Sequence, residues 1–286
     1  MILSMTGFGK ASLQLSTKKI TVEVKSLNSK GLDLNTRMPS VYRENELALR
    51  NLLALKLERG KVDFSLYVEV TGEDTSSKIN APIVKAYMAQ LKTILPNADD
   101  TELMKMAIRM PDTMKTEREE IDENEWKQIQ TVIDEAIENM LSFRKSEGAS
   151  LEKEFTLRIE NIRNYMNQAL ILDPERVNNI KERLQTAIDE LKVNVDTNRF
   201  EQELIYYLEK LDITEEKVRL TNHLDYFLQT LNGSEANGRK LGFITQEMGR
   251  EINTMGSKSN HAEMQKLVVM MKDELEKIKE QVLNVL

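Results

Sequence analysis

The spacing of apolar residues changes once along this chain, and that change limits the possible folds more than any other feature. Up to about residue 72, apolar and polar residues alternate, as they do between Val62 and Val70. A period of two places every second side chain on one face of a β-strand. Beyond residue 80, apolar residues recur every three or four positions, which is typical of amphipathic helices. The sequence therefore predicts an α+β protein.

The first part predicts a small β-sheet with one helix packed across it. Alternating residues mark further strands at 20–24 and 32–34, separated by a break at 28–31. After Ser40, a candidate N-cap, leucines fall on one helical face until Arg59 and Gly60 end the helix.

The remainder predicts long helices. Residues 122–192 are rich in Glu, Lys, Leu and Ala, with interruptions at Gly148 and Pro174. Because proline favours the first turn of a helix, we expect antiparallel helices with Pro174 starting the second arm. We therefore expect the whole chain to divide into three parts. These are a β-rich domain with a basic lobe at 1–80, a long helical arm at 81–195, and a helical C-terminal domain carrying the active site at 196–286.

Composition excludes several classes of protein. The chain has no cysteine, so disulfides, thiolate metal sites and cysteine nucleophiles are ruled out. No nucleotide-binding, zinc-protease or serine-hydrolase motif is present. The first ten residues lack the apolar core of a signal peptide, and no apolar run approaches the roughly 20 residues of a membrane helix. We therefore expect a cytoplasmic protein without a membrane partner.

Charge is distributed unevenly. Residues 1–61 hold eleven basic and five acidic residues, a net charge of +6, while the whole chain carries -7 and the remainder therefore -13. A basic lobe on an acidic body is typical of a protein of which only one part meets a polyanion. Charge alone does not distinguish this interpretation from an incidental surface pattern.

Residues 238–263 form the most polar of the predicted helices. Its buried stripe is Leu241, Ile244, Met248, Ile252 and Met255. A second face holds Lys240, Glu247, Glu251, Thr254 and Lys258, and a third Gln246, Arg250, Asn253 and Ser257. Glu247 and Glu251, one turn apart, repel each other unless a cation lies between them. Spacing favours ion pairing with Arg250 or a partner's lysine, and a divalent metal held by oxygen ligands is the alternative.

Two histidines offer little independent guidance. His223 lies on a predicted helix and His261 follows the polar one. A capping or hydrogen-bonding role is commoner for such residues than metal ligation.

Blocks along the whole chain resemble the YicC/YloC family. They are MILSMTGFG, KSLNSKGLDLNTRMP, RGKVDFSL, SEGASL, LDITEEKVRLTNHLDYF and GRKLGFITQEMGREINTMGSKS. The resemblance implies a bacterial cytoplasmic endoribonuclease that requires a divalent cation, manganese or magnesium. It also implies a homo-oligomer, expected to be a hexamer, that encloses a channel admitting RNA.

The resemblance also implies roles for individual residues. The expected metal ligands are Asp212, Glu216, Glu247 and Glu251, and the expected catalytic residues are Glu247, Glu251, Arg250, His223 and Lys258. Arg250 and Lys258 would stabilise negative charge on the phosphate, and His223 would transfer a proton. Expected RNA-binding residues are Asn28, Arg37, Arg59, Lys61, Arg239 and Lys240. Three positions depart from the family pattern: Gly242 replaces Asp, Gly249 replaces Asn, and His261 replaces Asn or Asp.

Two other functions fit the same features. A non-catalytic RNA-binding adaptor would use the basic lobe and bury the polar helix in a subunit interface. A helical scaffold would bind only proteins. Other RNA-decay proteins are further candidate partners.

The charge asymmetry leads to a first prediction. Replacing Arg37, Arg59 and Lys61 together with Ala should weaken RNA binding broadly and flatten its salt dependence, because phosphate contacts release counterions. Titrations of labelled RNA at several salt concentrations measure both. An unchanged affinity and salt slope would make the asymmetry incidental.

Overall fold

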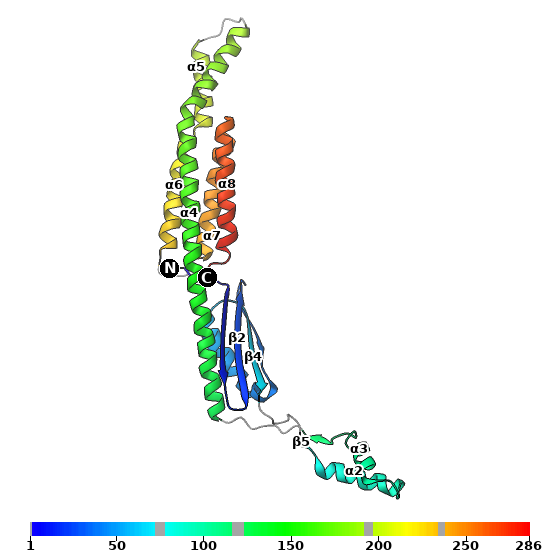
Figure 1. The fold of residues 1–286 in the computed structure, drawn as a ribbon. Helices are drawn as coiled ribbons and strands as arrows, with labels where there is room; N and C mark the ends of the chain where they lie inside the picture. The colour runs from blue at the N-terminus through cyan, green and yellow to red at the C-terminus, as the bar shows by residue number, and fades with distance from the viewer. Residues whose placement is uncertain (1, 72–77, 116–122, 192–196, 234–237) are drawn as a thin grey trace.

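A computed structural model describes residues 2–71, 78–115, 123–191, 197–233 and 238–286. Figure 1 shows an elongated molecule in which a β-sheet and a helical bundle lie along one very long helix. The expected α+β class, with a sheet and packed helix followed by long helices, is confirmed.

The sheet has four strands in the order β1-β2-β4-β3. Its members are β1 (Gly7–Gln14), β2 (Lys18–Leu27), β3 (Leu32–Arg37) and β4 (Gly60–Val70). β1, β2 and β4 pair antiparallel, whereas β3 runs parallel to β4. The connection between β3 and β4 holds a 3-10 helix, η1 (Ser40–Asn45), and helix α1 (Glu46–Leu57). The N-cap prediction for Ser40 is wrong, because Ser40 opens η1 and α1 begins one turn later.

One face of the sheet is buried and the other is open. Side chains alternate between the two along β2 and β4, as their period of two predicts. The buried face includes Val22, Val24, Val62 and Phe64, which pack against leucines of α1 and the first part of the long helix. The helices therefore cover only one side of the sheet.

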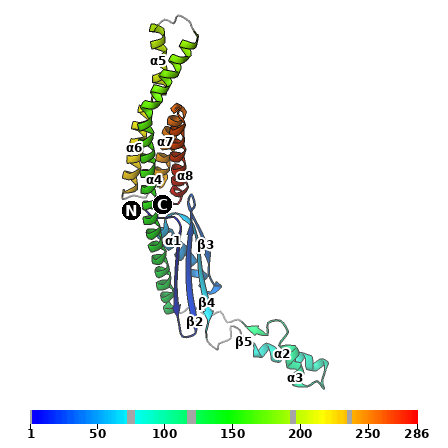
Figure 2. The same cartoon turned by 45° about the horizontal axis from the view of Figure 1, so that its top comes forward.

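A small module precedes the long helix. It contains β5 (Lys78–Ile79), α2 (Ala81–Ile94), α3 (Asp100–Ala107) and β6 (Met114–Lys115). β5 pairs antiparallel with β6, and α2 lies against α3. Figures 1 and 2 place this module beyond the end of the sheet that lies farthest from the bundle.

Helix α4 (Glu123–Leu191) is continuous over 69 residues, a length of about 100 Å. The predicted break at Pro174 is therefore wrong, and so is the interruption at Gly148. Near Pro174, the buried Arg176 donates to the Asp173 carboxylate (2.8 Å) and to the Lys258 carbonyl (3.0 Å). These bonds offset part of the cost of a proline inside a helix. Gly148 serves instead as a contact point, described below.

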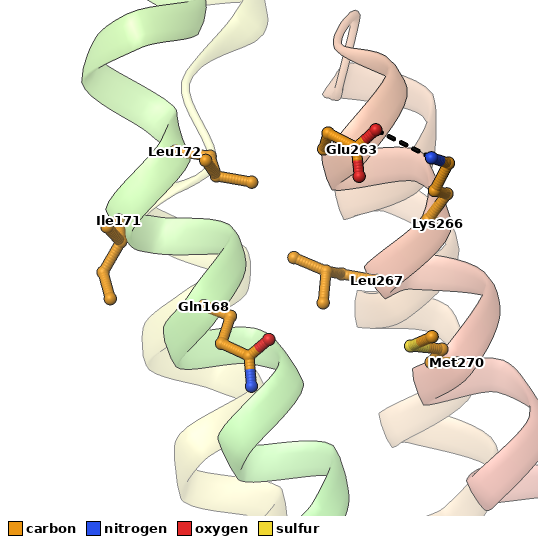
Figure 3. Close-up of a pocket in the computed structure, with 7 residues that line it drawn as sticks. All are labelled: Gln168, Ile171, Leu172, Glu263, Lys266, Leu267 and Met270. Atoms are coloured by element: carbon orange, nitrogen blue, oxygen red, sulfur yellow. Dashed lines mark hydrogen bonds and ion pairs between the residues drawn. The ribbon is translucent and has the colours of Figure 1, made fainter.

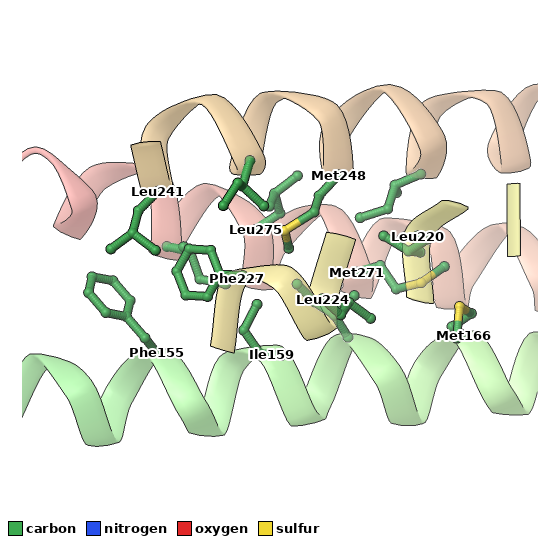
Figure 4. Close-up of a cluster of buried hydrophobic side chains, with 14 of the residues drawn as sticks. Phe155, Ile159, Met166, Leu220, Leu224, Phe227, Leu241, Met248, Met271 and Leu275 are labelled. Carbon is green, nitrogen blue, oxygen red and sulfur yellow. The ribbon is translucent and has the colours of Figure 1, made fainter. Parts of the chain in front are cut away.

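Four more helices complete the bundle beside the second half of α4. They are α5 (Thr197–Leu211), α6 (Thr214–Leu231), α7 (Gly238–Lys258) and α8 (Ala262–Val282). Figure 4 shows the core that α4 shares with α6, α7 and α8, in which Phe155 of α4 meets Phe227 of α6 edge to face at 5.8 Å. The stripe predicted for α7, from Leu241 to Met255, is buried and confirmed.

The two cores meet at a seam formed by one section of α4 and both ends of the chain. Met5 N donates to Asn284 O (2.7 Å), and Ser4 N donates to Arg144 O (3.1 Å). A Cβ at Gly148 would lie 2.1 Å from the Ile2 carbonyl oxygen. The first residues therefore cross α4 where only glycine leaves room.

None of the helices in the described ranges is both long and apolar enough to cross a membrane. The expected division at residues 80 and 195 stays a prediction. The structure adds that α4 contributes to both hydrophobic cores, with Ile129–Met140 in one and Leu151–Ala169 in the other.

The seam leads to a second prediction. Gly148→Ala should lower the melting temperature, although alanine favours helix, because the new methyl group collides with the Ile2 backbone. The matched control is Gly242→Ala in α7, where the nearest neighbour of a Cβ lies 3.8 Å away. That change should stabilise the protein by up to about 1 kcal/mol. Thermal denaturation of both variants tests the contact, and equal shifts would contradict it.

Candidate active site on helices α6 and α7

Helices α6 and α7 run antiparallel (Figure 1). A lysine joins them at one end. Lys258, the last residue of α7, donates from Nζ to Oε1 of Glu216 (2.7 Å) and to the carbonyl of Asp212 (2.9 Å). Glu216 is buried near the start of α6. This ion pair fixes the register of α7 against α6, that is, which residues of the two helices lie side by side.

The same register brings His223 and Glu251 to one level. His223 follows Glu216 by seven residues, and Glu251 precedes Lys258 by seven. Seven residues make about two helical turns, so each residue lies on the same face of its helix as its counterpart in the ion pair. The half-buried His223 and the buried Glu251 therefore lie opposite each other, about 10 Å along the helices from the ion pair.

Glu251 is a buried residue whose carboxylate reaches solvent. Its exposed fraction is 8%. Within the residues that the structure describes, no hydrogen bond or ion pair reaches the carboxylate. Glu216 has a buried Oε2 that accepts no hydrogen bond in the described chain. These two positions therefore have unused capacity to bind a cation or a hydrogen-bond donor.

Glu247 and Arg250 form an ion pair, one of the two arrangements that spacing left open. Arg250 Nη1 lies 2.8 Å from Glu247 Oε1, and the guanidinium is largely exposed. Such pairs at the surface contribute little stability. The Arg250 guanidinium can therefore bind an approaching anion. Among the described contacts, Arg250 pairs with Glu247 and not with Glu251.

Asp212 caps the first turn of α6. Its Oδ1 accepts from Thr214 Oγ1 (2.7 Å) and from Thr214 N (3.2 Å). The Thr214 hydroxyl and the nearby charge of Lys258 hold the pKa of the Asp212 carboxyl below its usual value. The exposed carboxylate is therefore ionised and already bonded on one oxygen.

The four expected metal ligands do not make a closed metal site. Asp212 and Glu216 lie near the start of α6, while Glu247 and Glu251 lie on α7. In the described part of the chain, no three His, Asp or Glu side chains are grouped closely enough to hold a metal ion. The arrangement fits a magnesium-like cation, which takes one or two carboxylates and fills its other positions with water and phosphate oxygens.

The departures from the family pattern lie on another side of α7. A Cβ at Gly249 would contact Leu275 Cδ2 of α8 at 3.3 Å, and one at Gly242 would contact Val282 of α8. Neither position faces His223. His261 caps α8 by accepting from Met264 N (3.4 Å), which confirms the capping alternative for this histidine.

The expected RNA-binding residues fall into separate places. Asn28, Arg59 and Lys61 lie together at the end of the sheet nearest the seam, where Arg59 Nε donates to Ser29 O (2.9 Å). Arg37 pairs with Ser65, about 13 Å farther along β4 than Lys61. Arg239 and Lys240 begin α7.

Tyr226 was not anticipated from the sequence. Its ring centroid lies 4.9 Å from Lys240 Nζ, and the ring is half exposed. Its position three residues after His223, on the same side of α6, is the signal that could have identified it.

A separate surface pocket lies between α4 and α8, with a volume of about 390 Å³. Figure 3 shows Ile171, Leu172 and Leu267 around it, with Glu263 and Lys266 paired at its edge (2.7 Å). Its lining is mainly apolar and includes none of the expected site residues. The pocket therefore belongs to a different surface from the candidate site.

The fold and the site together define a class: a sheet lobe and a helical bundle built on one helix, with a carboxylate-rich polar face on the bundle. The chain belongs to the YicC-like endoribonuclease family. The model for the N-terminal region of this family matches residues 2–153, and the model for its C-terminal region matches residues 171–286.

Two relatives are similar over their full length. A protein of Clostridioides difficile named "Probable endoribonuclease YicC" is 33% identical over 293 residues, covering 100% of both chains. A protein of Haemophilus influenzae with the same name is 28% identical over 286 residues, covering 99% of each.

The contrast between two buried glutamates gives a third prediction. Glu216→Gln should lower stability by about 2–4 kcal/mol, because Lys258 loses the charge that it faces. Glu251→Gln should leave the melting temperature level or raise it slightly, since no described ion pair is lost and the repulsion between Glu251 and Glu247 is relieved. The control is Glu276→Gln in an exposed pair with Lys279, with a change within about 0.5 kcal/mol. Denaturation without added metal measures all three, and a large loss for Glu251→Gln would contradict the assignment.

Proposed function

We propose that this chain is an endoribonuclease that cleaves RNA phosphodiester bonds at the face formed by α6 and α7, with a divalent cation, manganese or magnesium, as cofactor. The observation that carries the proposal is the carboxylate of the buried residue Glu251, without a described partner, at the level of His223. Family membership and the names of the two relatives support the same reaction.

Glu251 and Glu247 are the residues proposed to hold the cation. The other two expected ligands, Glu216 and Asp212, lie about 10 Å or more away along the helices and do not reach the same cation. When bound, the cation supplies charge neutralisation at the phosphate and lowers the pKa of bound water. The carboxylate of Glu251, without a described partner, is suited to this task.

His223 is the proposed proton-transfer group. Imidazole gains and loses a proton near neutral pH, which suits a general acid or base. Arg250 stabilises negative charge on the phosphate, because its guanidinium is exposed and held only by a surface ion pair.

Lys258 has a more limited role in this scheme. Its ammonium group already donates to Glu216 and to the Asp212 carbonyl. It therefore stabilises phosphate charge only after exchanging one of these partners, and otherwise keeps α6 and α7 in register. Arg239 and Lys240, at the start of α7, direct the RNA backbone toward the site.

The proposed setting is a cytoplasmic homo-oligomer, a hexamer enclosing a channel for RNA. Described surfaces outside the two cores expose large apolar side chains, including Ile94 on α2 and Ile205 and Tyr206 on α5. Exposed apolar residues in such numbers favour contacts between copies. A second copy could also complete the coordination of a cation that one chain holds with only two carboxylates.

A non-catalytic RNA-binding adaptor remains the alternative. Two ion pairs, Glu216–Lys258 and Glu247–Arg250, favour the adaptor. Ion pairs of this kind also occur between helices that have only a structural role. Other RNA-decay proteins would then be its partners. Cleavage separates the two functions, since an adaptor binds RNA without cutting it.

The fourth prediction tests catalysis directly. Glu251→Gln should reduce metal-dependent cleavage of a structured RNA by orders of magnitude, because a hard oxygen ligand is lost while side-chain shape is kept. Rates are measured per folded molecule, with manganese, with magnesium and with a chelator. Glu276→Gln on α8 is the control and should cleave like the unaltered protein. Full activity in Glu251→Gln, or equal cleavage in chelator, would overturn the metal-site assignment.

A further inference from the structure

The open face of the sheet carries two exposed aromatic rings. Phe8 of β1 is 42% exposed and Tyr67 of β4 is 51% exposed, and neither lies on the face covered by α1 and α4. Figures 1 and 2 show α4 along one side of the strands only. Exposing a large aromatic ring to water is unfavourable. Two such rings on one open sheet face therefore indicate a surface that binds a ligand with planar groups.

The register places the two rings well apart on the same face. Phe8 pairs with Lys25 of β2, and Tyr67 pairs with Thr21 of the same strand. Four residues along a strand and two strands across correspond to about 13 Å and about 10 Å. The rings can therefore accept two different groups of one extended ligand, and not a single small molecule.

Cations surround these rings, and Glu23 of β2 lies at the level between them. Lys25 Nζ is 5.6 Å from the Phe8 centroid, and both Lys25 and Lys10 contact Glu23. The two ammonium groups hold the pKa of Glu23 below its usual value, so one carboxylate faces two lysines. On the same face, the side chains of Lys19, Lys61 and Arg37 make no hydrogen bond or ion pair within the described ranges. Rings flanked by cations are typical of surfaces that bind single-stranded nucleic acid.

Charge on this lobe is complementary to a polyanion, although the face itself is nearly balanced. Residues 1–61 carry +6, whereas the remainder of the chain is acidic. Asp33, Asp63 and Glu69 lie on the open face with the cations. Long-range attraction therefore comes from the lobe as a whole, and the face contributes mainly contact with the rings.

We propose that the open face of the sheet binds single-stranded RNA by stacking bases on Phe8 and Tyr67. Lys25, beside Phe8, and Arg37, at a strand level between the two rings, neutralise the phosphates of the bound strand. The inference rests on the proposed function for the identity of the nucleic acid, and it adds a binding surface separate from α6 and α7. Every base has a flat face, so binding tolerates many sequences, but paired bases in a duplex cannot reach the rings.

The test is an anisotropy titration of the full-length protein with a labelled single-stranded RNA of 12 nucleotides and with the corresponding duplex, both in chelator to prevent cleavage. Phe8→Ala with Tyr67→Ala should weaken single-strand binding by at least about tenfold, with an unchanged salt slope, because stacking releases no counterions. Tyr67→Phe keeps a ring and should bind normally. Phe143→Ala removes a ring of similar exposure (45%) from α4, away from the open face, and is the matched control.

If the double alanine variant fails to fold by circular dichroism, leucine at both positions keeps apolar volume without a flat ring and is used instead. Binding within twofold of the unaltered protein, or an equal loss for the duplex, overturns the proposal. Cleavage is measured in parallel with metal. Ring-dependent binding without any cleavage would reject the nuclease and keep this surface, whereas cleavage with ring-independent binding would do the opposite.

Discussion

Arg144, 1% exposed and about one third of the way along α4, connects the sheet lobe to this helix through its guanidinium. It donates to the carbonyls of Met5, Leu57 and Arg59 and to the Ser26 hydroxyl. Burial lowers the pKa of Arg144, because these bonded partners are neutral and the charge is removed from water. The bonds nevertheless satisfy most of its donors, and they tie the chain start, the end of α1 and the start of β4 to one helix. Because α4 supplies both hydrophobic cores, the position of the sheet relative to the bundle depends on this seam.

Much of the fold could be predicted from local patterns. The alternation between Val62 and Val70 predicts β4, and the stripe from Leu241 to Met255 predicts the buried side of α7, since both depend on one element at a time. The predicted helix break at Pro174 was wrong because Arg176 bonds to Asp173 and also to Lys258 at the end of α7. The second bond joins residues far apart in the sequence, so local patterns do not reveal it. Local rules describe what proline does to an isolated helix, and tertiary contacts decided the outcome here.

The sequence predicts which residues of α7 form the candidate site, but not how they face the residues of α6. The pairing of Glu247 with Arg250 follows from spacing on a single helix. The isolation of Glu251 and the attachment of Lys258 to Glu216 depend on how α6 is aligned against α7, which spacing within α7 cannot reveal. Two buried glutamates thus differ because one meets a lysine and the other meets none in the described chain. A carboxylate without a bonded partner adds no pairing energy to the helix pair, and proteins commonly keep such groups where they serve function.

The continuity of α4 has a consequence for any ligand that touches both ends of the molecule. Helix α4 runs without a break through both hydrophobic cores, so one helix sets the separation between the sheet and the face formed by α6 and α7. An RNA held at both places must be long enough to reach across the seam, and a shorter fragment can occupy only one of them. The separation along α4 would therefore set a minimum RNA length. RNA fragments shorter than this would bind only one of the two surfaces and dissociate more readily.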